Sequence, residues 1–160
     1  MSLIFFKKII KTYKVFKSNK GLNITKYTTI VALGDKNGGL GIGKGINNEQ
    51  DISLLKAINN AKINFFKIFL KNSTIPHPIT GKSGKCIVTL FPLNKIINFS
   101  CGSYIRSVLD VMGIYKISSK IYGTGNFHNI IKALLNAFFN IESHIFSFNK
   151  KQINVHKKYI

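Results

Sequence analysis

The chain carries far more positive charge than a folded domain of its size needs for solubility. Its 160 residues include 24 Lys and Arg against five Asp and Glu, which gives a formal net charge of +19. A compact monomer with this charge repels itself, so we expect the native state to include a polyanion. Arg106 is the only arginine. Because lysine offers a point charge and not the planar fork that recognises a guanine edge, the composition favours contact with a phosphate backbone over sequence readout.

The rest of the composition indicates a folded protein and not a basic tail. Hydrophobic residues make up 45% of the chain and include 13 Phe, enough for the core of one domain or two small ones. No apolar stretch reaches the roughly 18 residues needed to cross a bilayer. Residues 1–17 alternate apolar pairs with lysines and lack acids, as an amphipathic membrane helix, a transit peptide or a basic arm that orders on RNA would. The segment lacks the Arg and Ser richness of a transit peptide, and we favour the basic arm.

The first half of the chain predicts a hairpin followed by a helix. Residues 28–35 are rich in β-branched side chains and end at a turn sequence, so residues 40–46 are expected to form the return strand. Residues 51–71 have helical periodicity. The expected apolar stripe consists of Leu54, Leu55, Ile58, Ala61, Phe65, Ile68 and Phe69.

Residues 72–85 interrupt regular structure, since Pro76, Pro78, Gly81 and Gly84 fall close together. After this break the pattern predicts a strand over 86–91 and a helix over 103–112 that ends at Gly113. A strand over 114–122 and a helix from a cap at Asn126 to about residue 141 follow. The resulting order of elements fits two small α+β units better than one continuous sheet.

The segment 38–45 places glycines at alternate positions, which are Gly39, Gly41, Gly43 and Gly45. It comes close to the nucleotide-binding loop, but a glycine stands where that loop needs a hydroxyl for Mg²⁺, and the dinucleotide-binding glycine pattern fails in every register. Alternating glycines leave one face of a strand without side chains, so another backbone can approach closely. With Lys36 and Lys44 beside this strand, we expect the approaching backbone to be RNA.

Catalytic and metal-binding patterns are missing from the sequence. The five acids are scattered, and no histidine has a carboxylate or nucleophile at a spacing that supports catalysis. The two cysteines lack the Cys-x-x-Cys spacing of a zinc site. We therefore predict no enzyme, no catalytic residue, no metal and no cofactor.

Four blocks of the sequence resemble the bacterial-type small-subunit ribosomal protein S-five family, which includes organellar members, in the family's order and spacing. They are ALGDKNGGLGIGKG, NSTIPHPITGKSG, CGSYIRSVLDVMGI and SSKIYGTGNFHNIIKALLNA. The resemblance spans about residues 13–143. It implies an α+β fold, in which a double-stranded-RNA-binding-like domain (a β-hairpin sheet plus a helix) is followed by a βαβα domain of the S-five domain-two type with a left-handed crossover. The expected boundaries are a basic arm at 1–12, the first domain at 13–75, a Pro/Gly linker at 76–85, the second domain at 86–143 and a basic tail at 144–160.

The resemblance also implies which residues contact RNA. Lys14, Lys17 and Lys20 match basic positions of the family's N-terminal loop, and Gly21 and Tyr27 match a glycine and an aromatic position. The sequence departs from the family pattern at Leu22, Asn23, Gly39 and Ile46. With the glycine strand and the nearby lysines included, the expected RNA-binding residues are Lys14, Lys17, Lys20, Gly21, Lys26, Lys36, Gly41, Gly43, Lys44, Lys56, Lys82 and Lys85.

The function that the resemblance implies is that of a structural constituent of the small ribosomal subunit. Such a protein binds small-subunit ribosomal RNA near the region where messenger RNA enters and is decoded, and it supports assembly and translational accuracy. The expected protein partners are S-four and S-eight, with S-three and messenger RNA nearby and no membrane. Arg106 matches the arginine of the helix that faces S-four, so we expect it at a protein interface.

The location and two alternative functions follow from weaker signals. A bias toward Lys, Ile, Asn and Phe indicates a genome rich in A and T. We therefore expect the ribosome of an organelle or of a reduced bacterial-type genome, and favour an organelle ribosome, in a relict plastid (apicoplast) first and in a mitochondrion second. The alternatives are a free-standing double-stranded-RNA-binding module and a cationic membrane-surface protein anchored by residues 1–17.

Overall fold

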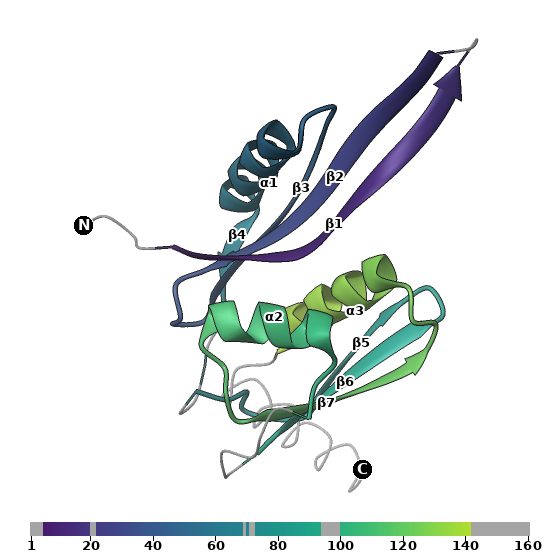
Figure 1. Ribbon diagram of the computed structural model, residues 1–160. Coiled ribbons are helices and arrows are strands. Elements are labelled where there is room, and N and C mark those ends of the chain that lie inside the picture. Colours follow the sequence, from purple (N-terminus) through teal and green to yellow (C-terminus); the bar gives the residue numbers. More distant parts are fainter. Residues whose placement is uncertain (1–4, 20–21, 69, 71–72, 94–99, 142–160) are drawn as a thin grey trace, which may run out of the picture.

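The computed structural model describes residues 5–19, 22–68, 70, 73–93 and 100–141. These residues form two antiparallel sheets and three helices stacked in layers, with α1 outermost, then the first sheet, then α2 with α3, then the second sheet (Figure 1). The elements are β1 (Phe6–Asn19), β2 (Leu22–Gly34), β3 (Gly39–Asn47), α1 (Gln50–Ile63), β4 (Phe65–Lys67), β5 (Ile79–Ser83), β6 (Cys86–Pro92), α2 (Ser103–Met112), β7 (Ile117–Gly123) and α3 (Phe127–Phe139). The predicted α+β class is confirmed.

The first sheet has the strand order β1-β2-β3-β4, and each pair of neighbours is antiparallel. The predicted turn between β2 and β3 is present. Oδ1 of Asp35 accepts hydrogen bonds from the backbone N–H groups of Asn37 at 2.8 Å and Gly39 at 2.7 Å, as short acidic side chains do in turns. Strand β1 corrects the sequence analysis, because residues 6–12 are part of this sheet and form neither an arm nor a membrane helix.

Helix α1 covers one face of the first sheet along the glycine strand. A Cβ atom at Gly43 would lie 2.0 Å from the carbonyl oxygen of Ala57, and Gly41 and Gly45 are crowded in the same way. The buried residues that α1 presents here are small, namely Ser53, Ala57 and Ala61. Two residues of β3 span about 6.6 Å and four residues of α1 span about 6 Å. Every second residue of β3 therefore meets every fourth residue of α1. The predicted close approach of a backbone occurs, but that backbone is α1 and not RNA.

Helix α1 is shorter than the helix predicted over 51–71. It ends at Ile63, and residues 65–67 form β4, which pairs with β3. The predicted apolar stripe is wrong in part, because the Leu55 side chain is 60% exposed whereas Ala57 and Ala61 are fully buried. The glycine face leaves room only for small side chains, so close packing and not hydropathy selects the inward face of α1.

The second sheet has the strand order β5-β6-β7, again antiparallel. Strand β5 lies inside the predicted linker at 76–85, so that prediction is wrong for residues 79–83. The two helices agree with the prediction. Helix α2 ends at Gly113, whose φ of 79° is left-handed, and the side chain of Asn126 accepts the N–H of His128 at 3.2 Å at the start of α3.

The predicted left-handed crossover concerns the connection through α2. This helix joins β6 to β7, and those two strands pair antiparallel. Ser100, which precedes α2, forms a parallel bridge with Ser118 of β7. A connection between two parallel segments is either right-handed or left-handed. Because residues 94–99 lie outside the described part of the chain, the handedness stays a prediction.

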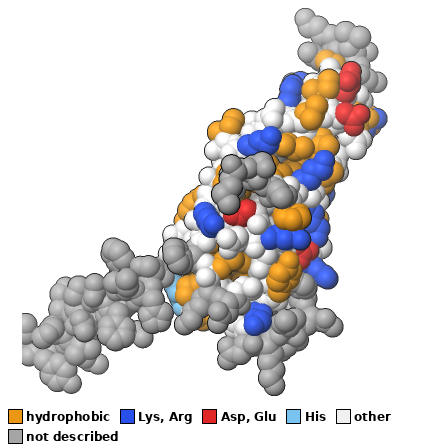
Figure 2. All heavy atoms as spheres, turned by 90° about the vertical axis from the view of Figure 1, so that its left-hand side faces the viewer, with side chains coloured by type: hydrophobic (Ala, Val, Ile, Leu, Met, Phe, Trp, Pro, Cys, Tyr) orange, Lys and Arg blue, Asp and Glu red, His pale blue; other side chains and the backbone are white. Residues whose placement is uncertain are grey.

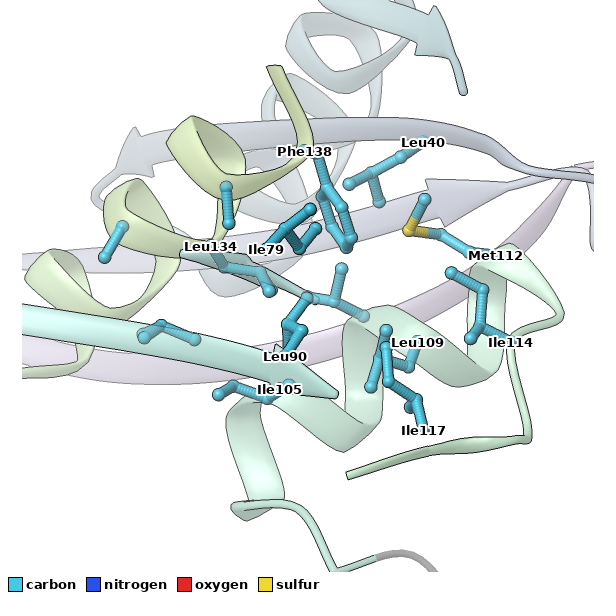
Figure 3. Close-up of a cluster of buried hydrophobic side chains, with 14 of the residues drawn as sticks. Leu40, Ile79, Leu90, Ile105, Leu109, Met112, Ile114, Ile117, Leu134 and Phe138 are labelled. Carbon is cyan, nitrogen blue, oxygen red and sulfur yellow. The ribbon is translucent and has the colours of Figure 1, made fainter. Parts of the chain in front are cut away.

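One hydrophobic core joins the two sheets. Ala32 and Leu40 of the first sheet are buried in the same cluster as side chains of α2, α3, β5 and β6. Figure 3 shows Leu40, Met112 and Phe138 lying close together although they come from β3, α2 and α3. A smaller cluster on the α1 side consists of Val31, Leu33, Ala57 and Ala61. The alternating side chains of β2 enter both clusters, so the first sheet is covered on both faces.

Candidate nucleic-acid interface

The hairpin of β1 and β2 extends beyond the rest of the first sheet. Strand β3 pairs with β2 only over residues 27–34, whereas β1 pairs with β2 along its whole length. Residues 15–19 and 22–26 therefore form a two-stranded ribbon that projects from the molecule (Figure 1). We call this segment the projecting ribbon. Among the described residues no third strand flanks it, and the side chains of Val15, Phe16 and Ile24 are exposed, so they are available to a partner.

At the base of the projecting ribbon, a lysine lies beside two aromatic rings on one face of the hairpin. Nζ of Lys14 lies 4.8 Å from the ring centroid of Phe16 and 5.6 Å from that of Tyr27, within the range of a cation–π attraction. The Phe16 side chain is 69% exposed. Exposed rings beside an ammonium group can stack on bases while the charge attracts the phosphate backbone. Sequence reasoning missed Phe16, because one Phe among 13 carries no signal of exposure.

The opposite face of the hairpin contacts the second domain. The hydroxyl of Tyr13 lies 3.2 Å from Nε2 of His128, and its ring meets that of Phe127 edge to face with 5.9 Å between centroids. Nζ of Lys11 lies 4.7 Å from the Phe127 ring centroid and 5.7 Å from that of Tyr104. We call the place where β1, α2 and the start of α3 meet the domain seam. The rings of Phe127 and Tyr104 hold the ammonium group of Lys11 in position.

Lysines from three elements act on His128 at the domain seam. Burial lowers the pKa of the His128 imidazole, and the positive charges of Lys44, Lys132 and Lys11 lower it further. The predicted residue Lys44 therefore lies within electrostatic reach of α3. Lys11 and Lys132 were not predicted, because nothing in the sequence links residues of β1, β3 and α3 that only the tertiary fold brings together.

Lys82 and Lys85 add positive charge beside α3. Lys82 is exposed on β5, and Lys85 is exposed in the turn that leads into β6. The carbonyl oxygen of Lys85 accepts the N–H of Thr124 at 3.3 Å, shortly before α3 begins. The carbonyl oxygen of Lys82 accepts Nδ2 of Asn136 at 2.9 Å. Their backbones are thus fixed to α3 and its preceding loop, and their side chains are left to solvent.

Other predicted residues are placed apart from the domain seam. Lys36 lies at the far end of the first sheet, where its N–H donates to the carbonyl oxygen of Val111 at 3.1 Å and its Nζ lies 4.0 Å from the Phe6 ring centroid. Gly41 and Gly43 are covered by α1, so the predicted close contact of RNA with their bare face is wrong.

Lys56 is exposed on α1. Figure 2 shows the side of the molecule that lies on the left in Figure 1, where α1 is found. On this face, lysines are spread among hydrophobic side chains and acidic side chains are sparse (Figure 2). The exposed apolar residues of α1 are Ile52, Leu55 and Ile63. This surface is mixed and carries no compact basic patch.

The remaining predicted RNA-binding lysines belong to the projecting ribbon or its tip. Lys26 is exposed and lies directly opposite Val15, on the face of the ribbon away from Lys14. Lys17 is part of β1. Lys20 and Gly21 lie outside the described residues.

Arg106 is exposed on α2, and its place at a protein interface stays a prediction. Asp110, one turn further along this helix, binds Lys8 of β1 with 2.5 Å between Oδ2 and Nζ. This ion pair links α2 to the first sheet and supplies Asp110 with a cationic partner from outside its own helix.

The described part of the chain contains no group of three or more side chains able to hold a metal ion. None of the helices in these ranges has the length and apolarity to cross a membrane.

The fold and the surface define a class of protein, namely a small cationic α+β protein with lysines and exposed rings placed to bind a polyanion. Residues 5–69 match the family model described as ribosomal protein S5, N-terminal domain, and residues 81–151 match that of the C-terminal domain. Similar proteins include the small ribosomal subunit protein uS5 of Fusobacterium nucleatum, 37% identical over 130 residues that cover 81% of this chain and 79% of the relative. The uS5 protein of Nitrosomonas eutropha is 34% identical over 136 residues, covering 85% and 77%. The chain belongs to the ribosomal protein S5 family.

Proposed function

We propose that the chain is a structural constituent of the small ribosomal subunit and binds small-subunit ribosomal RNA. The observation that carries this proposal is that both domains of the ribosomal protein S5 family are matched in order, over residues 5–69 and 81–151. The curated relatives at about a third identity carry the name small ribosomal subunit protein uS5. A net charge of +19 favours association with a polyanion such as ribosomal RNA.

The geometry supports recognition of the RNA backbone and of unpaired bases. Nearly all basic residues are lysines, which attract phosphate as point charges but lack the bidentate fork for base edges. The ring of Phe16 beside Lys14 supplies a stacking surface on the projecting ribbon. Lys26, Lys44, Lys56, Lys82 and Lys85 are exposed and serve as phosphate contacts in this proposal, together with Lys17, Lys20, Gly21 and Lys36.

The protein neighbours belong to the same proposal. Arg106 is the only arginine of a chain in which lysine fills nearly every basic position, and it is exposed on α2. A guanidinium grips a carboxylate with two parallel hydrogen bonds, which an ammonium group cannot do. We infer that Arg106 contacts a carboxylate of ribosomal protein S-four, with S-eight as a second neighbour and with S-three and messenger RNA nearby.

The proposed role is structural, without catalysis or a cofactor, and includes support of assembly and of translational accuracy. The composition bias supports an organelle ribosome, in a relict plastid before a mitochondrion, although the relatives reported above are bacterial. The free-standing RNA-binding module is not favoured, because the family match continues through the second domain. The membrane-surface alternative loses its anchor helix, because residues 6–17 lie in strand β1.

A salt titration of RNA binding tests the proposal. If about six to ten lysines contact phosphates, the affinity for a small-subunit ribosomal RNA transcript falls by roughly three to five orders of magnitude between about 50 and 200 mM salt, with duplex DNA as the guide. Filter binding or fluorescence anisotropy measures this slope. An affinity that does not change with salt contradicts the proposal.

A further inference from the structure

The domain seam gathers positive charge that no described acid neutralises. Lys11 of β1, Lys44 of β3 and Lys132 of α3 all act on the charge of His128. Among the described lysines, those in ion pairs are Lys8 with Asp110 and Lys67 with Asp35. Lys132 lies one helical turn after His128 on α3, and Lys44 lies on the same face of β3 as Leu40, which packs against the second domain. Positive charges gathered around one imidazole repel one another, which favours an anion at this place.

The groups of the seam are held in place before any ligand binds. The ring of Phe127 lies under Nζ of Lys11 at 4.7 Å and beside the His128 ring, with 3.9 Å between the two centroids. Tyr13 fixes the other side of the imidazole through its hydroxyl, 3.2 Å from Nε2. Binding an anion here costs little side-chain entropy at Lys11 and His128, because these two donors are already positioned.

We propose that Lys11, Lys44, His128 and Lys132 form one binding site for an RNA phosphate, which couples the two domains to the same stretch of RNA backbone. The site rests on the proposed function, because RNA is the partner that supplies the phosphate. Two of its four residues come from the first sheet and two from α3. A single bound phosphate therefore bridges the domains at a place where protein contacts alone leave uncompensated charge.

A bound phosphate also changes the protonation of His128. In the free protein, burial and the three lysines favour the neutral imidazole. A phosphate offsets the lysine charges and favours the protonated form, so binding takes up a proton. Other titratable groups of the described parts of β1 and α2 are Tyr13 and Tyr104, whose rings contact that of Phe127, and the ion pair of Lys8 with Asp110. RNA binding through this site is therefore stronger at about pH 6 than at about pH 8, since His128 has its ordinary pKa near 6.5.

Two double variants with equal loss of charge test the site. Lys44→Ala/Lys132→Ala removes two seam lysines that are exposed, and Lys62→Ala/Lys120→Ala removes two exposed lysines from α1 and β7. The probe is a transcript of the Fusobacterium nucleatum small-subunit ribosomal RNA. The seam variant is expected to lose about 10- to 100-fold in affinity and about one unit of salt slope, whereas the control loses less than about threefold. Thermal unfolding of both variants checks that they are folded.

The possible results separate the site from the proposed function. Equal losses in the two double variants overturn the phosphate site and leave ribosomal RNA binding intact. A wild-type chain without salt-dependent binding to the transcript overturns the proposed function itself. In a second measurement, NMR follows the histidine rings of the wild-type chain, with the His128 signal assigned by its loss in His128→Asn. The pKa of His128 is expected to rise when RNA is added, and an unchanged pKa in the RNA complex contradicts the site.

Discussion

The backbone N–H of Lys36 donates a hydrogen bond to the carbonyl oxygen of Val111 at 3.1 Å, so a turn of the first sheet closes the end of a helix in the second domain. The N–H of Gly38 makes the matching bond to Met112, also at 3.1 Å. The last carbonyl groups of α2 have no partner within the helix, and this turn supplies donors for two of them. The two domains are therefore joined by backbone hydrogen bonds as well as by a common core.

The carboxylate of Asp35 makes the stability of this turn depend on pH. Burial alone raises the pKa of the Asp35 carboxyl, but hydrogen bonds from the N–H groups of Asn37 and Gly39 and the charge of Lys67 outweigh it, so the net pKa is below the ordinary value of 3.8. A lowered pKa contributes stability that is present above the unfolded-state value and lost as the pH falls through the folded-state value. Because the chain has only five acidic residues, Asp35 accounts for a large share of the pH dependence that its carboxylates can give to the stability.

We expect Asp35→Asn to make the free energy of unfolding depend less on pH in the acid range. Urea unfolding at about pH 5 and about pH 2.5 is expected to show a smaller loss of unfolding free energy in the variant than in the wild type. The amide keeps an oxygen acceptor for the turn, so the comparison isolates the charge. If the variant and the wild type lose the same unfolding free energy between these two pH values, Asp35 is not the cause of the acid sensitivity.

Gly43→Ala is expected to destabilise the first domain strongly. The added Cβ would lie 2.0 Å from the carbonyl oxygen of Ala57 and 2.4 Å from the N atom of Ala61, and both are backbone atoms that cannot rotate away. The free energy of unfolding should fall by about 3 kcal/mol or more, at the upper end of overpacking effects. Gly125→Ala is the control, because a Cβ there has no neighbour within 4 Å. Equal melting temperatures for the two variants would show that α1 does not pack this closely on β3.

Phe16→Ala tests the stacking surface of the projecting ribbon. The side chain is 69% exposed, so we expect the stability to stay within about 0.5 kcal/mol of the wild type. If a base stacks on the ring, affinity for the ribosomal RNA transcript should drop by about 1–3 kcal/mol. Leu55→Ala, at an exposed position of α1, removes a comparable apolar group outside the ribbon. The assignment fails if both variants bind as tightly as the wild type.

Arg106→Lys separates protein contacts from RNA contacts. The substitution keeps the charge but removes the planar fork, so binding to naked ribosomal RNA should be nearly unchanged. Binding to ribosomal protein S-four, measured by calorimetry with the purified partner, is expected to weaken by about 1.5–3 kcal/mol, the value of a charged hydrogen bond. Loss of RNA affinity together with unchanged binding to S-four would assign Arg106 to RNA instead.

The elements that were predicted correctly are those whose sequence carries its own end signals. Helix α2 has a regular apolar face and stops at Gly113, and α3 starts at the cap Asn126, so local rules find both. Strand β5 was not predicted, because the prolines before it and the glycines within and after it resemble a linker. Gly81 has a different role, which is to let α3 approach β5 closely. A Cβ atom at Gly81 would lie 2.0 Å from the carbonyl oxygen of Ala133.

The site was harder to predict than the fold because it depends on contacts between distant segments. The glycine strand was correctly interpreted as a place of close backbone approach, but the identity of the approaching backbone depends on the small residues of α1. The domain seam joins Tyr13 to His128 across 115 positions of sequence. Exposure of Phe16 likewise depends on where β3 stops pairing with β2, and no local pattern records this.

Sedimentation of lysates from cells that make the chain tests whether it is part of the small ribosomal subunit. In a sucrose gradient at about 100 mM salt, we expect the chain to sediment with small-subunit ribosomal RNA. Treatment with RNase should release it, because the charge of +19 needs the RNA as its partner. A chain that stays at the top of the gradient, or that sediments with other RNAs and without the small subunit, would contradict the account.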